Sequence, residues 1–434
     1  MSESLRAFRG AILHCLRDPG EGGARDAAEY FEDGLLLVED GRVAALGPAA
    51  ELLPQLADSA ELIDHRGRLL LPGFIDTHVH YPQLDVIASY GAQLLEWLEQ
   101  YTFPQEQRFA DAQHAAALAE LFLDELLRNG TTTALVFATV HPGSVDAFFR
   151  AAQARRLRMI CGKVLMDRNC PPALRDTAES GAAESRALIE RWHGVDRLLY
   201  AITPRFAPTS TPAQLAAAGR LAAEYPDVYV QSHLAENPAE CAWVAELFPE
   251  SRSYLDVYQR HALLRERALF AHCIHLDDAD RRCMAGQGAA MSFCPSSNLF
   301  LGSGLFDLAA ARDAGLRVGL GTDVGGGNSF SLLQTASDGY KVCQLRGRKL
   351  PALRALYLAT LGGAEALYLD HRLGNFATGK EADFVVIDPA ATPLLARRTE
   401  IAADIEEQLF ALLMLGDDRL VLETRVLGEL VHRR

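Results

Sequence analysis

Two histidines two residues apart, His78 and His80, are the first residues along the chain that suggest metal chemistry. They close the stretch LLLPGFIDTHVHYPQ, residues 69–83, which begins as an apolar run. Because side chains alternate along a strand, residues two apart lie on the same face. Two imidazoles on one face at a strand end can bind one metal ion, for which zinc is the commonest fit and iron an alternative. Alone the pair is a weak signal, so the rest of the chain must supply the missing ligands.

Composition narrows the class of protein before any further motif is considered. The chain has 434 residues, 49% hydrophobic and 23% charged, which suits a large globular domain with a smaller one. The net charge of −15 argues against nucleic acid or an anionic membrane as the main partner. The eight cysteines never form CxxC, and the N-terminal apolar stretch is too short and interrupted for a membrane span or a secretory signal. We therefore expect a cytoplasmic protein.

Strands and helices alternate from residue 111 onward, and this rhythm predicts the fold class. Eight parallel strands alternating with helices are typical of a closed (β/α)8 TIM barrel. The interval from His78 to Asp323 is 245 residues (323 − 78), close to the roughly 250 of that barrel. A doubly wound open sheet is the alternative, but it rarely needs eight parallel strands. The expected strands are the one ending in the histidine pair, then 131–138, 159–165, 198–203, 228–232, 268–271, 289–293 and 317–321.

Both chain ends read as β-structure. A hairpin is predicted over residues 34–47, with a turn at Asp40-Gly41, and the last stretch, 419–434, also looks extended. We expect residues 1–66 and 374–434 to form one small, β-sandwich-like domain. Residues 67–373 would then form the barrel.

Ligand-type residues follow four of the eight expected strands. His233 follows the fifth strand, His272 the sixth and Asp323 the eighth, besides the pair on the first. In such barrels catalytic residues lie just past the C-terminal strand ends, so these side chains should share one mouth. Unrelated core histidines would have to place four of the chain's thirteen histidines at equivalent positions. The sequence therefore predicts one divalent metal bound by His78, His80, His233, His272 and Asp323.

Two carboxylates are candidates for moving protons at that metal. A divalent ion lowers the pKa of bound water to about 7, and Asp323 could hold or deprotonate this water. Glu236 lies three residues past His233, about one helical turn on, so it can face the same site. The alternative for Glu236 is a helix-start carboxylate that interacts with the helix dipole.

Four motifs, PGFIDTHVH, SHLAE, AHC and GTDV, together resemble the amidohydrolase superfamily in its mononuclear deaminase branch. The resemblance covers nearly the whole chain. It implies that the four histidines and Asp323 bind the metal and that Glu236 moves protons. The binuclear branch uses a carbamylated lysine after the fourth strand. Here Arg205 stands there and the nearest lysine, Lys163, belongs to the third strand, which favours one metal.

Four further segments resemble the guanine deaminase family: LLEWLEQYTFPQEQRF (94–109), HYPQ (80–83), GKVLMDRNCP (162–171) and TPRFAPT (203–209). The resemblance implies that Gln83 and Arg205 hydrogen-bond a purine, that Phe206 packs on its ring and that His233 also contacts it. It further implies a homodimer. The plainer alternatives are a structural ion pair for Arg205, a solvated loop position for Gln83 and ordinary core packing for Phe206.

The resulting hypothesis is hydrolytic deamination of guanine to xanthine and ammonia by a metal-activated water. One alternative is a deaminase of another aminoheterocycle, such as 8-oxoguanine, a pterin, cytosine or an adenosine derivative. Another is a non-catalytic interaction protein that retains the barrel. We expect His141 and His275 to support the structure without contacting the metal. The long stretch 81–109 is either a functional loop or a peripheral helix whose aromatic side chains simply pack.

Overall fold

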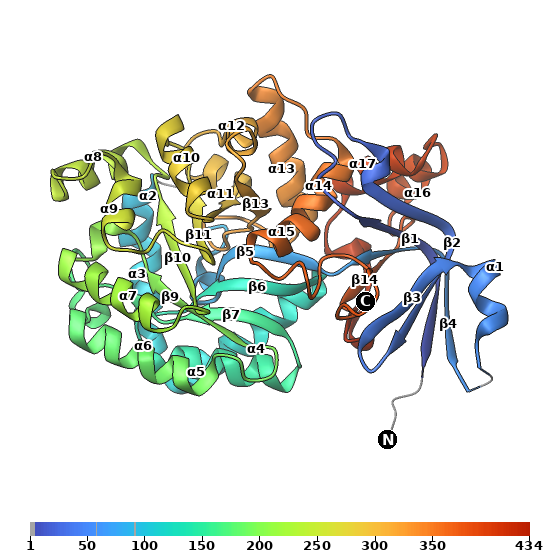
Figure 1. Cartoon of the computed structure of the whole chain (residues 1–434), viewed down its shortest axis with the longest axis horizontal. Helices are drawn as coiled ribbons and strands as arrows, with labels where there is room; N and C mark the ends of the chain where they lie inside the picture. The colour runs from blue at the N-terminus through green and yellow to red at the C-terminus, as the bar shows by residue number, and fades with distance from the viewer. Residues whose placement is uncertain (1–4, 58, 91–92) are drawn as a thin grey trace. The chain divides into compact units, whose positions relative to one another are not determined.

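The computed structural model describes residues 5–57, 59–90 and 93–434 (Figure 1). Residues 1–4 and 58 of the predicted small domain, and 91–92 of the stretch 81–109, lie outside the described residues. The chain divides into two compact units, one of residues 1–75, 124–133 and 331–434 and one of 76–123 and 134–330. The domain bounds given above stay predictions.

One sheet of seven strands is built from both chain ends, as predicted. Strand β4 lies parallel to β1 and antiparallel to β14, so it joins the N-terminal strands to the C-terminal ones. Asp40 and Gly41 both have positive φ (49° and 73°), the backbone that a tight β2–β3 hairpin turn needs. The order is β16 (Glu429–Arg433), β15 (Val421–Val426), β14 (Phe384–Ile387), β4 (Glu61–Pro72), β1 (Arg6–Cys15), β2 (Ala28–Glu39) and β3 (Arg42–Pro48).

The second sheet is the predicted (β/α)8 barrel, and its strands match the expected ranges to within a few residues. Main-chain hydrogen bonds from Asp323 to the His78 carbonyl and from His80 to the Val324 carbonyl, both 2.9 Å, join the first strand to the segment after the last. The strands run β13 (Arg317–Leu320), β12 (Ala290–Phe293), β11 (Ala268–His272), β10 (Tyr229–Leu234), β9 (Leu199–Pro204), β7 (Arg158–Gly162), β6 (Thr131–Phe137) and β5 (Phe74–His80), with β8 (Val164–Leu165) beside β9.

Helices alternate with the barrel strands and cover their outer side (Figure 1). They are α4 (Ala112–Arg128), α5 (Pro142–Ala154), α6 (Ala178–Trp192), α7 (Pro212–Glu224), α8 (Pro238–Leu247), α9 (Tyr254–Arg260), α10 (Asp278–Gly286) and α12 (Leu308–Asp313). The short helix α11 (Pro295–Phe300) follows β12 and carries Asn298, which contacts His272. Further helices are α1 (Ala49–Leu52), α13 (Leu332–Leu345), α14 (Ala352–Ala359), α15 (Leu361–Ala366), α16 (Pro393–Glu400) and α17 (Ile405–Leu415). Within the described ranges, none combines the length and the apolar character that crossing a bilayer requires.

The stretch after β5 folds as a series of short turns of helix. Its described elements are η3 (Tyr81–Val86), α2 (Leu94–Trp97), the π-helical η4 (Leu98–Thr102), α3 (Phe103–Gln107) and η5 (Arg108–Ala110). Trp97 and Phe103 are buried in one apolar cluster with Phe206. Packing aromatics, the plainer expectation for this stretch, are therefore present, and the candidate site below gives the stretch a second role.

Gly162 offers a direct test of the packing between β7 and β9. A Cβ built on Gly162 would lie 1.7 Å from the carbonyl oxygen of Ala201, a backbone atom that cannot rotate away. We expect Gly162→Ala to lower the free energy of unfolding by about 3 kcal/mol, as overpacking does. Urea denaturation measures this. The control is Gly286→Ala, because a Cβ on Gly286 meets nothing within 4 Å. Equal unfolding midpoints for the two variants would contradict the packing described.

Candidate active site

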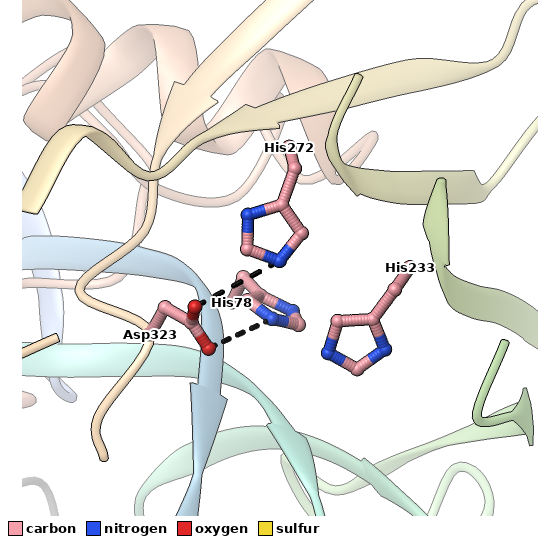
Figure 2. Close-up of side chains that lie close together, drawn as sticks. All are labelled: His78, His233, His272 and Asp323. Carbon is pink, nitrogen blue, oxygen red and sulfur yellow. Dashed lines mark ion pairs between the residues drawn. The ribbon is translucent and has the colours of Figure 1, made fainter. Parts of the chain in front are cut away.

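Four strand ends bring ligand-type side chains to one point (Figure 2). His78 comes from β5, His233 from β10 and His272 from β11, while Asp323 follows β13. One donor atom of each lies within 4.8 Å of the donor atoms of the other three. A carboxylate and three imidazole nitrogens this close together have the composition and spacing of a divalent metal site.

His80 lies directly beside this group of four. Its Nε2 atom is 3.3 Å from Nε2 of His78, 3.2 Å from Nε2 of His233 and 3.3 Å from Oδ1 of Asp323. The structure therefore brings all five residues predicted as ligands together. Nitrogen atoms that face each other need a proton or a cation between them, because two lone pairs at this distance repel.

Hydrogen bonds on the outer ring nitrogens orient two of the imidazoles. Nδ1 of His233 lies 2.7 Å from the Arg205 carbonyl oxygen, and Nδ1 of His272 lies 2.8 Å from Oδ1 of Asn298. Both partners are acceptors, so each Nδ1 carries the proton and each Nε2 presents a lone pair. Nε2 of His272 is buried without a hydrogen-bond partner. These donor atoms fit a divalent cation.

Burial sets the protonation of the same imidazoles. Burial lowers the pKa of His80 to about 3, and it also lowers the pKa values of His78 and His233. Burial opposes ionisation of Asp323, but its electrostatic interaction and hydrogen bond with His78 and its hydrogen bond with His80 hold its pKa well below the usual range. Neutral imidazoles and an ionised carboxylate are the forms that bind metal.

The backbone at two of the ligands adopts a conformation that side chains other than glycine rarely take. His272 has φ 70° and Asp323 has φ 51°, and Ala235, two residues after His233, has φ 50°. Such residues cost on the order of 1 kcal/mol or more each and cluster at functional sites. These unusual φ values therefore occur at or next to the strand ends that carry three of the ligands.

Asp76 connects β5 to the segment after β13 through hydrogen bonds next to the ligand group. It accepts hydrogen bonds from the main-chain N–H groups of His78 and Thr322, both at 3.1 Å, and from the Thr322 hydroxyl. Burial raises the pKa of Asp76 to about 7. Both of its oxygen atoms are engaged by these donors, so Asp76 positions the ligands.

Glu236 is buried at the edge of the ligand group. Its Oε2 lies 3.4 Å from Nε2 of His272, and its Oε1 accepts a hydrogen bond of 3.0 Å from the Ser303 hydroxyl. Burial, and then the charge of Asp323, raise the pKa of Glu236 to about 8. Glu236 does not act as the helix-start carboxylate, because Glu240 accepts the main-chain N–H groups of Glu236 and Asn237 at the start of α8. The structure thus places Glu236 where a proton carrier would stand.

A cavity opens on the ligand group and holds the four residues predicted to contact the purine, His233 among them. It encloses about 410 Å³ including its mouth, and Gln83, Arg205 and Phe206 line it together with Glu236. The other residues of its wall are His80, Leu94, Trp97, Leu98, His233, His272, Leu301, Asp323 and Gly326. Apolar walls with a few polar groups are typical of sites for flat organic ligands.

The plainer alternatives proposed for Gln83, Arg205 and Phe206 have different outcomes in the structure. Gln83 is only 4% exposed, so it is not a solvated loop residue. Arg205 does form a buried ion pair, with both carboxylate oxygens of Glu106 at 2.8 Å, and it also lines the cavity. Phe206 belongs to an apolar core cluster and lines the cavity as well.

Three residues considered in the sequence do not join the site. Lys163 pairs with Asp176 and Glu184 and is not part of the cavity wall, so it is not placed to bridge two metals. His141 is also not among the wall residues. His275 is outside the wall as well, and its Nε2 donates a hydrogen bond of 2.9 Å to the Ser303 carbonyl oxygen.

Sequence reasoning missed the residues that support the site: Asn298, Ser303, Glu240 and Glu106. Three of them act on a site residue far away in sequence, such as Glu106 on Arg205, which is 99 positions away, whereas Glu240 acts on Glu236, four positions before it. The one sequence signal for Glu106 is its position three residues after Phe103, because this spacing places a charged side chain on the same helix face as an aromatic one.

Comparisons with known proteins agree with this geometry. The model of the amidohydrolase family matches residues 69–428. Guanine deaminase of Escherichia coli is 50% identical over 99% of this chain and 98% of its own length, and a probable guanine deaminase of Deinococcus radiodurans is 45% identical over 95% of both. The solved structure of the E. coli enzyme has a TM-score of 0.97, covering 99% of this chain and 100% of that one. A Clostridium structure, guanine deaminase from C. acetobutylicum with bound guanine, has a TM-score of 0.89 at 27% identity, over 99% and 100% of the two chains.

The ligand geometry predicts the metal content of variants. We expect the purified protein to hold about one divalent ion per chain, and His272→Ala to lose most of it because a central nitrogen donor is removed. His141→Ala is the matched control, since His141 is outside the cavity wall. Inductively coupled plasma mass spectrometry measures the content. Equal metal in both variants would refute the assignment of His272.

The buried carboxyl of Glu240 predicts a pH dependence of stability. Burial raises its pKa from 4.5 to about 7, so between these values the folded state keeps a proton that the unfolded chain has lost. This group therefore makes the wild type less stable as pH rises through that window. Glu240→Gln cannot titrate, so the stability gap between wild type and variant should narrow by roughly 1–3 kcal/mol with rising pH. Urea unfolding across the window measures it, with the exposed Glu246→Gln as control. A gap that is constant with pH contradicts the assignment.

Proposed function

Because this chain belongs to the amidohydrolase family, we propose that it hydrolyses guanine to xanthine and ammonia. The observation that carries the proposal is its 50% identity with Escherichia coli guanine deaminase along nearly the full length of both chains. The cavity supports it independently, because Gln83, Arg205 and Phe206 lie around the same space as the ligand group.

One divalent metal, zinc by preference and iron as the alternative, is the cofactor that the donor set supports. His78, His80, His233, His272 and Asp323 would hold it. When bound, such an ion supplies a water activated for attack near neutral pH. A single metal is favoured because Lys163 is engaged by Asp176 and Glu184.

Glu236 is the residue we assign to proton transfer. Its pKa of about 8 means that, before metal is bound, it carries a proton at neutral pH. Held by the Ser303 hydroxyl at 3.0 Å, it can give a proton to the ring nitrogen adjacent to C2 and then take one from the attacking water. Asp323 can take the second proton of that water as the C2–O bond becomes a carbonyl, and Asp323 or Glu236 then passes a proton to the departing ammonia.

The purine is read by polar groups on one side of the cavity and by apolar surfaces on the other. The guanidinium of Arg205 presents a planar fork that matches neighbouring acceptors such as O6 and N7 of guanine. The ring of Phe206 offers a flat apolar face, and His233 can contact the base from the metal side. A base that lacks the matching acceptors would leave these buried polar groups without hydrogen bonds. That cost weakens its binding and gives selectivity.

Several finer statements belong to this proposal as well. The substrate is a small purine; a net charge of −15 does not suit nucleic acid as a partner. The homodimer and the cytoplasmic location stay predictions from the sequence. A non-catalytic barrel is disfavoured because all five residues of the ligand set are present and converge.

Steady-state ammonia release from guanine tests the activity, with Glu236→Gln alongside. We expect turnover by the wild type and a fall in kcat of roughly a hundredfold to ten-thousandfold in the variant, the range for loss of a general acid–base group. Metal content should not change. Glu246→Gln, on the exposed face of α8, is the control and should keep full activity.

A panel of aminoheterocycles decides the substrate. Metal-loaded wild type that releases ammonia from 8-oxoguanine, a pterin, cytosine or an adenosine derivative but not from guanine would overturn the substrate assignment while leaving the reaction class intact.

A further inference from the structure

Glu106 is a charged side chain that is completely buried, with 0% exposure, in the stretch after β5. Both of its carboxylate oxygens accept a hydrogen bond of 2.8 Å from the same nitrogen of Arg205, Nη1. Oε1 also lies 3.5 Å from the amide nitrogen of Gln83. One carboxylate therefore contacts both polar residues that we assign to purine recognition.

Glu106 stands behind these two residues and does not face the ligand. Gln83 and Arg205 belong to the cavity wall, whereas Glu106 is not among the residues that line it. A ligand in the cavity would meet the guanidinium and the amide, and Glu106 would act only through them. By its place in the structure it is a positioning residue.

The local fold explains how a carboxylate comes to be buried here. Helix α3 is a little over one turn, and Phe103 and Glu106, three residues apart, lie on the same face of it. The guanidinium carbon of Arg205 lies 5.4 Å from the centre of the Phe103 ring. The guanidinium is thus held by a charge and by an aromatic face from a single turn of helix.

Gln83 is fixed at both ends of its amide. Its Oε1 accepts from the main-chain N–H of Gly325 at 3.2 Å, and its Nε2 faces Glu106. A carboxylate can only accept, so this pairing allows one orientation of the amide. Glu106 therefore fixes the position of the Gln83 amide nitrogen, whose second N–H group is left to donate to a ligand.

Charge gives Glu106 its second effect. A lone guanidinium in a buried cavity would attract anionic ligands, because its charge is poorly screened there. The pair of Arg205 and Glu106 has no net charge, yet the remaining N–H groups of Arg205 stay available as donors. A neutral ion pair with free N–H donors suits an uncharged base that carries hydrogen-bond acceptors.

We propose that Glu106 is a specificity-determining residue of this site: it positions Arg205 and Gln83 and keeps the purine reader electrically neutral, so that neutral aminopurines are preferred over anionic purines. The proposal rests on the proposed function for the identity of the substrate.

Inhibition by two product-like purines tests the charge effect in the metal-loaded enzyme. In mildly alkaline solution xanthine is largely a monoanion, whereas hypoxanthine is largely neutral. In Glu106→Gln, which keeps the shape and removes the charge, we expect xanthine to gain at least roughly tenfold in inhibition relative to hypoxanthine. The KM for guanine should rise roughly tenfold or more with unchanged metal content.

Two further variants separate the effect of the Glu106 charge from the effect of its position, and both of these from a nonspecific effect of substitution in this stretch. Glu106→Asp keeps the charge on a shorter stem, so it should raise KM while leaving the xanthine-to-hypoxanthine ratio near that of the wild type. Glu99→Gln changes an exposed carboxylate in the same stretch and should behave as wild type. If Glu106→Gln does not fold, the wild-type ratio in Glu106→Asp with raised KM still supports the proposal.

The outcomes are distinguishable from failure of the proposed function. A wild type that releases no ammonia from guanine refutes the function, and the ratio is then measured by calorimetric binding of the two purines. A folded Glu106→Gln with the wild-type ratio overturns the charge role, and Glu106→Asp with the wild-type KM overturns the positioning role.

Discussion

Two main-chain hydrogen bonds that close the barrel are the constraint on which the site depends. Asp323 donates to the carbonyl of His78, and His80 donates to the carbonyl of Val324, both at 2.9 Å. They place the end of β5 against the segment after β13, so that the first and last parts of the barrel face each other. Asp76 reinforces the same junction from below through His78 and Thr322. Loss of this register would separate two histidines from the carboxylate that completes their group.

Burial then decides the chemistry of what this junction brings together. In a dry site the charged form of each group is disfavoured unless a partner compensates it. The imidazoles therefore become neutral and ready to bind a cation, as the lowered pKa of His80 shows. The same burial raises the pKa of Glu236 and gives it a proton to donate. Burial thus lowers the pKa of the imidazoles and raises the pKa of Glu236. The directions differ because the charged form of an imidazole is a cation and that of a carboxyl group is an anion.

The sequence predicted the parts of this site that depend on periodicity. Alternation of strands and helices, with His233, His272 and Asp323 at strand ends, was enough to place them in one mouth, because parallel strands of a barrel all end on the same side. It could not predict the partners of those residues. Asn298 comes from α11 and Ser303 from the segment after it, whose positions depend on tertiary packing, and nothing in their local pattern distinguishes them from other polar residues. The stretch after β5 was the least predictable part, since its short turns follow no single period.

The metal-ligand side and the purine side of the cavity share one low-dielectric space but need opposite charge states of their basic side chains. On the metal face, imidazoles must lose their charge, and burial is the largest cause of that. On the purine face, a charged guanidinium is buried, which costs free energy unless a partner compensates the charge. Arg205 stays a usable donor there because Glu106 supplies the opposite charge from a turn of helix that does not touch the ligand. A buried ion pair is weak evidence for stability, but it is well suited to present directed hydrogen bonds without a net field. The stretch after β5 therefore contributes to recognition through electrostatics as well as through the aromatic packing that its composition first suggested.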